Sequence, residues 1–167
     1  MTYEWPLYFC LFLALWSAVV GGTFAAFSEF IMSALKKTEA AGGIEAMQHI
    51  NRDVIKTQFV AGILSIAIFS AVFALYSLFV FEGAALVTLI LAPMVYLPSV
   101  LFMTMFGNVP MNNALDKLEH SSLDARYYWE KYTKVWTQLN HARSFGSILT
   151  AGIYVTAAIT LINSGQV

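Results

Sequence analysis

The fold is decided by an uncharged run at residues 57–81, TQFVAGILSIAIFSAVFALYSLFVF, which contains no acidic or basic side chain over 25 residues. A helix needs about 20 mostly apolar residues to cross the hydrocarbon layer of a membrane, so this run is long enough to span it. On either side of it, charged residues delimit three more runs of this kind. The sequence therefore predicts four membrane-spanning helices, at about residues 5–35, 57–80, 84–106 and 144–163.

The composition of the whole chain supports this interpretation. Of its 167 residues, 59% are hydrophobic and 11% are charged, and the mean hydropathy is +0.67. Soluble domains carry roughly 25% charged residues. The composition excludes a disordered protein, a nucleic-acid binder and an ordinary soluble enzyme. We expect an all-α fold: an integral membrane four-helix bundle, formed by residues 1–167 as one domain, with two additional cytoplasmic helical segments.

The basic residues predict the orientation of the spans. All nine lie in the two long connections, between the first and second spans and between the third and fourth. By the positive-inside rule, both connections are cytoplasmic and both termini lie outside the inner or plasma membrane. Tyr3, Trp5 and Tyr8 suit an aromatic belt at the outer interface. The first span is expected to be retained, because no basic residue precedes it as in a signal peptide.

Both cytoplasmic connections are expected to contain a helix. Residues 44–56 show mixed helical periodicity after a break at Gly42-Gly43. Residues 123–143 show a helical pattern that continues into the fourth span. This second segment either rises above the membrane as part of one long helix or lies on the bilayer surface.

The spans themselves contain few special residues. Pro93 and Pro98 predict bends in the third span, either as tolerated kinks or beside a widened pocket. Cys10 is the only cysteine, so no intrachain disulfide exists, and its apolar surroundings predict a packed thiol.

Glu29 is the most informative single residue in the spans. It lies seven positions before Lys36, which places it about 10 Å deeper in the membrane. An intramembrane carboxylate usually faces the bundle interior or a water-filled cavity, where it can accept or donate a proton. The alternative is that Glu29 reaches the cytoplasmic interface or pairs with a basic group such as Arg143.

Two adjacent amides, Asn112 and Asn113, follow the third span. Pro110 disfavours helix at the residue before it, and one of the two amides is suited to cap a helix that begins near Ala114. The other amide is then free to bind a polar ligand or a facing helix.

Aromatic and polar side chains share one face of the second cytoplasmic segment. Spacings of three and four residues align Trp129, Tyr132, Trp136, Asn140 and Arg143. Such a strip predicts a site for a flat anionic or phenolic molecule, held by stacking and hydrogen bonds. The alternative is an interfacial amphipathic helix, with its rings among the lipid headgroups and its guanidinium on lipid phosphate.

The sequence gives little support for a metal site. Its histidines, His49, His120 and His141, share no metal-binding spacing. A site built from Glu29, His49 and His141 is conceivable but has no motif behind it. The chain has no haem-attachment motif and no phosphate-binding loop, so the cofactor is left open, with a metal ion or haem not excluded.

Several stretches resemble the anthrone oxygenase-like family of small four-span membrane proteins. They are GTFAAFSEFIM at 22–32, MQHIN at 47–51, NVPMNNAL at 108–115 and WTQLNHAR at 136–143. The resemblance implies oxidation of an anthrone to an anthraquinone by molecular oxygen, without a conventional cofactor. It also implies that the family's polar positions are those occupied by Asn112, Asn113, Asn140, His141 and Arg143.

Two hypotheses follow. In the first, an oxygenase holds a lipid-soluble aromatic substrate in a pocket at the cytoplasmic face. Glu29 or His141 takes a proton from that substrate, and Arg143 stabilises the resulting anion. The substrate-binding residues are then Asn51, Asn112, Asn113, Tyr132, Trp136 and Asn140. In the second, the bundle is a non-catalytic membrane subunit that binds a lipid, quinone, pigment or haem, or packs in a homo-oligomer or larger membrane complex.

Overall fold

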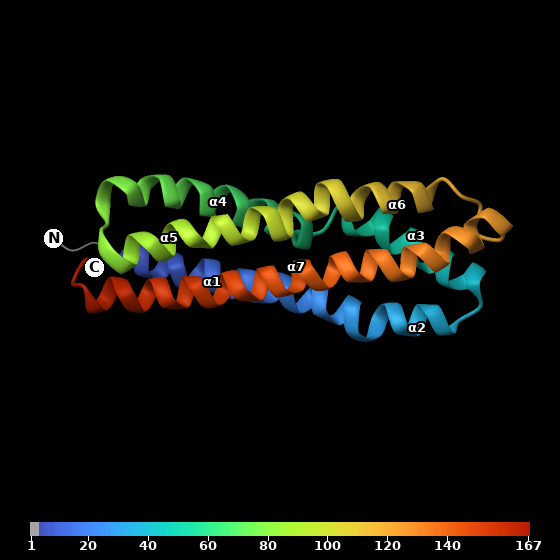
Figure 1. The fold of residues 1–167 in the computed structure, drawn as a ribbon, viewed down its shortest axis with the longest axis horizontal. Helices are drawn as coiled ribbons and strands as arrows, with labels where there is room; N and C mark the ends of the chain where they lie inside the picture. The colour runs from blue at the N-terminus through green and yellow to red at the C-terminus, as the bar shows by residue number, and fades with distance from the viewer. Residues whose placement is uncertain (1–3) are drawn as a thin grey trace.

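The computed structural model describes residues 4–167, and all regular structure in this range is helical. Four long helical rods run side by side (Figure 1). The second and fourth rods are single helices, α4 Gln58–Val80 and α7 Leu123–Asn163. The first and third rods consist of consecutive segments: α1 Trp5–Ala26, η1 Phe27–Ile31 and α2 Met32–Lys37, then α5 Gly83–Tyr96, η2 Leu97–Phe102, η3 Thr104–Asn108 and α6 Val109–Asp116. A shorter helix, α3 Ala40–Val54, lies between the first and second rods in the chain.

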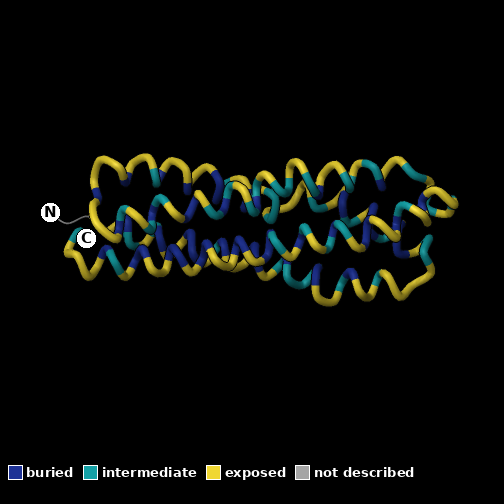
Figure 2. The backbone as a smooth tube through the Cα atoms, viewed as in Figure 1, coloured by how far each residue is buried: buried dark blue, intermediate teal, exposed yellow. Residues whose placement is uncertain are grey.

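Each of the four rods contains a stretch long and apolar enough to cross a membrane. The outward-facing positions of the bundle are exposed along its length (Figure 2). In the apolar stretches these positions carry large hydrophobic side chains, such as Leu75, Phe79 and Val87, which are 60%, 83% and 62% exposed. A surface of large hydrophobic side chains is favourable in contact with lipid hydrocarbon and unfavourable in contact with water. The all-α expectation is confirmed, and the protein is an integral membrane protein.

The bundle has two halves with different contents (Figure 1). The terminal half holds both ends of the described chain and consists of α1, α4, α5 and the second part of α7. The connection half holds both long connections and consists of α2, α3, α6 and the first part of α7. The assignment of the connection half to the cytoplasm stays a prediction. Trp5 and Tyr8 are exposed in the terminal half, and Tyr3 lies outside the described residues.

In the terminal half, α1 and α7 pack closely through small residues. A Cβ atom on Gly21 would lie 2.7 Å from the side chain of Ile148, so only glycine allows this approach. Ser144 Oγ donates a hydrogen bond to the carbonyl oxygen of Gly21 at 2.9 Å, across the same contact. Small residues and hydroxyl groups are the usual contacts between helices in membranes. Cys10 is fully buried in the core of this half, as expected.

The third rod continues through both of its prolines. Pro93 lies inside α5, and Pro98 begins the π-helical turn η2. Proline removes a backbone donor, and π-helical turns accommodate the resulting mismatch without ending a helix. The Thr104 hydroxyl donates to the carbonyl oxygen of Val100 at 2.6 Å in this region. The expected end of the span near residue 106 is therefore not the end of the helix, which continues to Asp116.

Helix α3 also continues where the sequence predicts a break. Gly43 lies inside the helix, and a Cβ atom there would be 2.7 Å from the carbonyl oxygen of Leu35 and 3.2 Å from the ring of Trp129. Gly43 therefore allows α3 to approach its neighbours closely, and the prediction of a break at the Gly42-Gly43 pair is wrong.

The connection half has a protein core of its own. Ile44, Met47 and Leu115 are fully or almost fully buried there, with Tyr132 and Trp136. The aromatic face of the second segment thus packs into the bundle and not onto a bilayer surface. The segment is one helix with the fourth span, as predicted, and its 41 residues extend about 60 Å.

Candidate functional site

A buried guanidinium lies where the two halves of the bundle meet. Arg143 is 5% exposed, and within residues 4–167 no carboxylate lies at ion-pair distance from it. Its Nη1 donates to Thr104 Oγ1 at 3.3 Å, and its Nη2 donates to Asn140 Oδ1. Among the described residues, its Nε has no hydrogen-bond partner. A buried charge is costly unless it is paired. Within residues 4–167 no acidic group pairs with Arg143, so protein groups do not neutralise its positive charge.

Two aromatic rings flank this guanidinium. Its central carbon lies 4.2 Å from the ring centroid of Phe24 and 5.4 Å from that of Trp136. Cation–π contacts of this kind stabilise a desolvated cation by about 2 kcal/mol or more. The rings therefore hold Arg143 in place without neutralising its charge.

Asn140 fixes Arg143 from the adjacent turn of α7. Its Nδ2 donates at 2.6 Å to both the carbonyl oxygen of Phe24 and the hydroxyl of Ser28, while its Oδ1 accepts from Arg143. Ser28 lies in the π-helical turn η1, a type of turn that often occurs at functional sites. All of the hydrogen-bonding atoms of the Asn140 amide are oriented by these contacts, so Asn140 positions Arg143.

A second network orients Asn112 on α6. Its Oδ1 accepts hydrogen bonds from the hydroxyl of Tyr132 and from Trp136 Nε1, both at 2.8 Å. The Tyr132 hydroxyl in turn accepts from Asn51 Nδ2 at 3.3 Å. Burial raises the pKa of Tyr132, so its hydroxyl stays protonated and acts as the donor. With Oδ1 fully used, Asn112 keeps its NH₂ group as the free hydrogen-bonding part of the amide.

These networks border a cavity of about 380 Å³, here called the junction cavity. Its apolar wall comes from α4, from the third rod and from the end of α3, and includes Ile63, Leu64 and Met105. Its polar wall consists of Asn51, Arg52, Thr104, Asn112, Asn113, Asp116 and Arg143.

A smaller cavity of about 70 Å³ adjoins the junction cavity on the side of α1 and α7. The two share Asn51, Asn112 and Arg143, and the smaller one also includes Trp136 and Asn140. The predicted amides, the guanidinium and the indole therefore do converge. Tyr132 contributes through its hydrogen bond to Asn112 and lines neither cavity.

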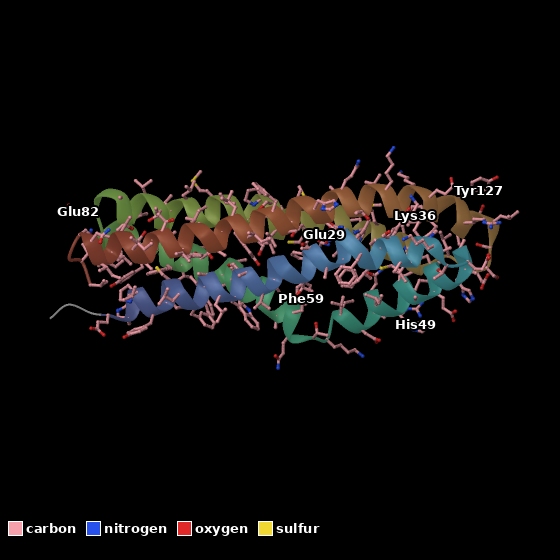
Figure 3. All side chains as sticks on the ribbon, turned by 90° about the horizontal axis from the view of Figure 1, so that it is seen from below. Glu29, Lys36, His49, Phe59, Glu82 and Tyr127 are labelled. Carbon is pink, nitrogen blue, oxygen red and sulfur yellow. The ribbon has the colours of Figure 1, made fainter. Side chains whose placement is uncertain are left out.

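Glu29 does not take part in this convergence, contrary to the expectation. It is exposed and lines neither cavity, and it forms no ion pair with Arg143. Ser28 points at Asn140, and the next residue on a helix points about 100° away. Figure 3 shows Glu29 and Phe59 at similar positions along the bundle, so Glu29 is level with the first turn of α4 and not deep within the spans.

His141 lies outside both cavities because it follows an inward-pointing residue on a helix, as Glu29 does. Asn140 points inward, and His141 is exposed and lines neither cavity. The expectation that Glu29 and His141 face one shared cavity is therefore wrong. Within residues 4–167, no three His, Cys, Asp or Glu side chains are grouped to hold a metal ion, so the conceivable site of Glu29, His49 and His141 is not formed.

The sequence did not single out several residues that the structure brings to the site. Thr104 and Ser28 hold Arg143 and Asn140, and Asp116 lines the junction cavity beside Asn112. A signal for Asp116 was available, because Val109, Asn112 and Asp116 follow helical spacing. The predicted start of a new helix near residue 114 separates Asp116 from Asn112 and hides this signal.

The fold and the site together define a class: a four-span membrane bundle with a ligand-sized cavity at one end of its spans. A sequence model of the family described as anthrone oxygenase matches residues 53–153, and the chain belongs to this family. The match includes Asn112, Trp136, Asn140 and Arg143 and excludes Glu29 and Asn51. Comparison with the curated proteins and with the solved structures found no match.

Proposed function

We propose that the protein oxidises a flat, lipid-soluble aromatic or phenolic substrate of the anthrone type with molecular oxygen in the junction cavity. The single observation that carries the proposal is the buried Arg143, which within residues 4–167 has no carboxylate partner and an unpaired Nε, beside a mostly apolar cavity. A site that holds an unneutralised cation in low-dielectric surroundings stabilises an anionic ligand strongly. Membership of the anthrone oxygenase family favours this chemistry over simple anion binding.

The chemistry needs an anion. An anthrone loses a proton from its methylene carbon to give an electron-rich enolate, which donates an electron to O₂ and then combines with the reduced oxygen to form a carbon-bound peroxide. Loss of the second methylene proton with cleavage of the O–O bond releases hydroxide and leaves a carbonyl group. The sum is one anthrone and one O₂ converted to one anthraquinone and one water. Arg143 opposite the enolate oxygen favours the first step by stabilising the charge.

The two walls of the cavity suit such a substrate. The apolar side chains of α4 and η3 accommodate the rings, and the free NH₂ group of Asn112 and the amide of Asn113 donate to its oxygens. Leu64 and Met105 line the cavity and are also about half exposed on the outer surface of the bundle. This favours entry of the substrate sideways from the bilayer, and the positive-inside rule puts the cavity at the inner leaflet.

The test is oxygen consumption by the purified protein with a panel of hydroxylated anthrones, comparing Arg143→Gln with Arg143→Lys. We expect one O₂ per anthrone, no accumulation of hydrogen peroxide, and a fall in kcat/KM of at least about 100-fold in Arg143→Gln. Arg143→Lys keeps the charge and should retain more activity, although it loses the planar stacking on Phe24.

Because Arg143 also forms hydrogen bonds within the protein, thermal unfolding in detergent must show that both variants fold. Binding of a hydroxyanthraquinone, followed by the change in its visible absorbance on ionisation, provides a readout independent of turnover. If the wild-type protein neither consumes oxygen with any anthrone nor binds the ionised quinone, the proposal fails. A stoichiometric co-purified haem or pigment would instead favour the non-catalytic subunit.

A further inference from the structure

The groups that face the junction cavity narrow the choice of proton acceptor. The first step of the proposed reaction needs a base, and neither Glu29 nor His141 lines the cavity. Its ionisable lining residues are Arg52, Asp116 and Arg143. Two of these are guanidinium groups, whose N–H groups donate hydrogen bonds, so Asp116 carries the one carboxylate among them.

Asp116 is placed on the same face of the third rod as the amides of the site. Val109 lies three residues before Asn112 and four before Asn113, Asp116 lies four residues after Asn112 and three after Asn113, and all four line the cavity. Residues with this spacing lie above one another along a helix. A substrate whose oxygens are held by Asn112 and Asn113 therefore lies within one helical turn of the Asp116 carboxylate.

Arg52 holds that carboxylate from the facing helix α3. Its Nε donates to Asp116 Oδ1 at 2.6 Å, and both side chains line the cavity. Within residues 4–167 no hydrogen bond occupies Oδ2, so one carboxylate oxygen remains available. The side chains of Arg52 and Asp116 are 52% and 41% exposed, so both are in contact with water. An ion pair this exposed contributes little to the stability of the fold. A proton taken up there can pass directly to solvent.

We propose that Asp116 is the catalytic residue that accepts the methylene proton of the substrate, with Arg52 as its positioning residue. This inference rests on the proposed function. In the step, the C–H bond breaks, its electron pair stays on the substrate as the enolate beside Arg143, and the proton forms an O–H bond to Asp116. The protonated carboxyl group returns the proton to water before the next turnover, and O₂ is the oxidant in the later steps.

The experiment measures the effect of each substitution on two substrates, one that needs a base and one that does not. One is a hydroxylated anthrone that is neutral at the assay pH, and the other is a nitro-substituted anthrone that is already ionised. General-base catalysis contributes about 10²–10⁴-fold, so Asp116→Asn should lower kcat/KM by that factor for the neutral anthrone. For the ionised anthrone the loss should be below about tenfold. Asp53→Asn, which changes an exposed carboxylate on α3 outside the cavity, should leave both rates unchanged.

An isotope effect provides the second readout. With the methylene group deuterated, Asp116→Asn should show a larger primary isotope effect than the wild-type protein, because proton removal becomes rate-limiting. Arg52→Gln should lower the rate for the neutral anthrone less than Asp116→Asn does. Equal losses for both anthrones, or an unchanged isotope effect, would assign Asp116 a structural role and overturn the inference. If Arg143→Gln is inactive and Asp116→Asn is not impaired, the proposed function stands and only the role of Asp116 is overturned. If the wild-type protein oxidises no anthrone, both the proposed function and the role of Asp116 are overturned.

Discussion

The polar side chains that join helices in the terminal half differ in their hydrogen-bond partners from those that border the cavities at the junction. In the terminal half, the hydroxyls of Ser144 and Ser147 donate to backbone carbonyl oxygens of α1. At the junction and in the connection half, Arg143, Asn140 and Asn112 bond mainly to other side chains. The first arrangement joins helices, and the second fixes the orientation of groups that also line a cavity.

The difference separates stabilising polar groups from functional ones. Among the described residues, polar atoms without a hydrogen-bond partner occur in both halves: the hydroxyl of Ser17 in the terminal half, and Nε of Arg143 at the junction. The Ser17 hydroxyl is enclosed in packed protein and lines neither of the cavities described above, whereas the guanidinium borders both. A polar atom without a partner indicates a ligand site only where there is space for a ligand, and this is the case at the junction.

The largest change in stability should come from the connection half. Asn112→Leu removes the acceptor of both Tyr132 and Trp136, and leaves two buried donors unpaired. An unpaired buried donor costs about 1–3 kcal/mol, so the free energy of unfolding should fall by roughly 3 kcal/mol. Denaturation in detergent, followed by tryptophan fluorescence, measures it. Asn113→Leu is the matched control, because the neighbouring amide is exposed and makes no hydrogen bond within residues 4–167. Equal losses in both variants would show that the network contributes nothing.

A smaller loss is expected from overpacking in the terminal half. In Gly146→Ala the new Cβ atom would lie 2.5 Å from Cβ of Ser99, so α7 and η2 must move apart. Overpacking of this kind costs about 1–3 kcal/mol. Gly152→Ala on the same helix is the control, because nothing lies within 4 Å of a Cβ atom there. The midpoint of thermal unfolding should fall for Gly146→Ala and stay within error for Gly152→Ala; the reverse order would contradict the contact between α7 and η2.

The sequence was sufficient for the fold because the bilayer imposes a simple rule. An uncharged run of about 20 residues has to be helical to satisfy its backbone in hydrocarbon, and the four rods follow from four such runs. The sequence did not predict that two of the helices continue through residues that usually interrupt a helix. Gly43 and Pro98 usually interrupt helices in water, but close packing on Leu35 and a π-helical turn keep both helices intact. These effects depend on neighbours that are distant in sequence.

The site was predictable only in part, and for a related reason. Spacing along α7 correctly grouped Trp136, Asn140 and Arg143, because one straight helix carries all three. Glu29 was assigned to the interior from its charge and depth alone, and its direction depends on the π-helical turn η1. Asp116 was overlooked because a break was expected before its helix. Spacing along an uninterrupted helix predicts the direction of a side chain; His141 lies on the same helix, but it was a candidate from the family resemblance and not from its spacing.

The smallest effect is expected from the hydroxyl contacts of the terminal half. Ser147→Ala removes the hydrogen bond from Ser147 Oγ to the carbonyl oxygen of Ser17, which is 2.8 Å long and fully buried. Hydrogen bonds between membrane helices contribute about 0.6 kcal/mol on average, and the carbonyl group keeps its place within α1. Unfolding in detergent should register a loss of roughly that size, and binding of the hydroxyanthraquinone should be unchanged. A loss above about 2 kcal/mol in the free energy of unfolding, or weaker binding of the hydroxyanthraquinone, would mean that the packing of α1 on α7 sets the position of Arg143. The two halves would then form one functional unit.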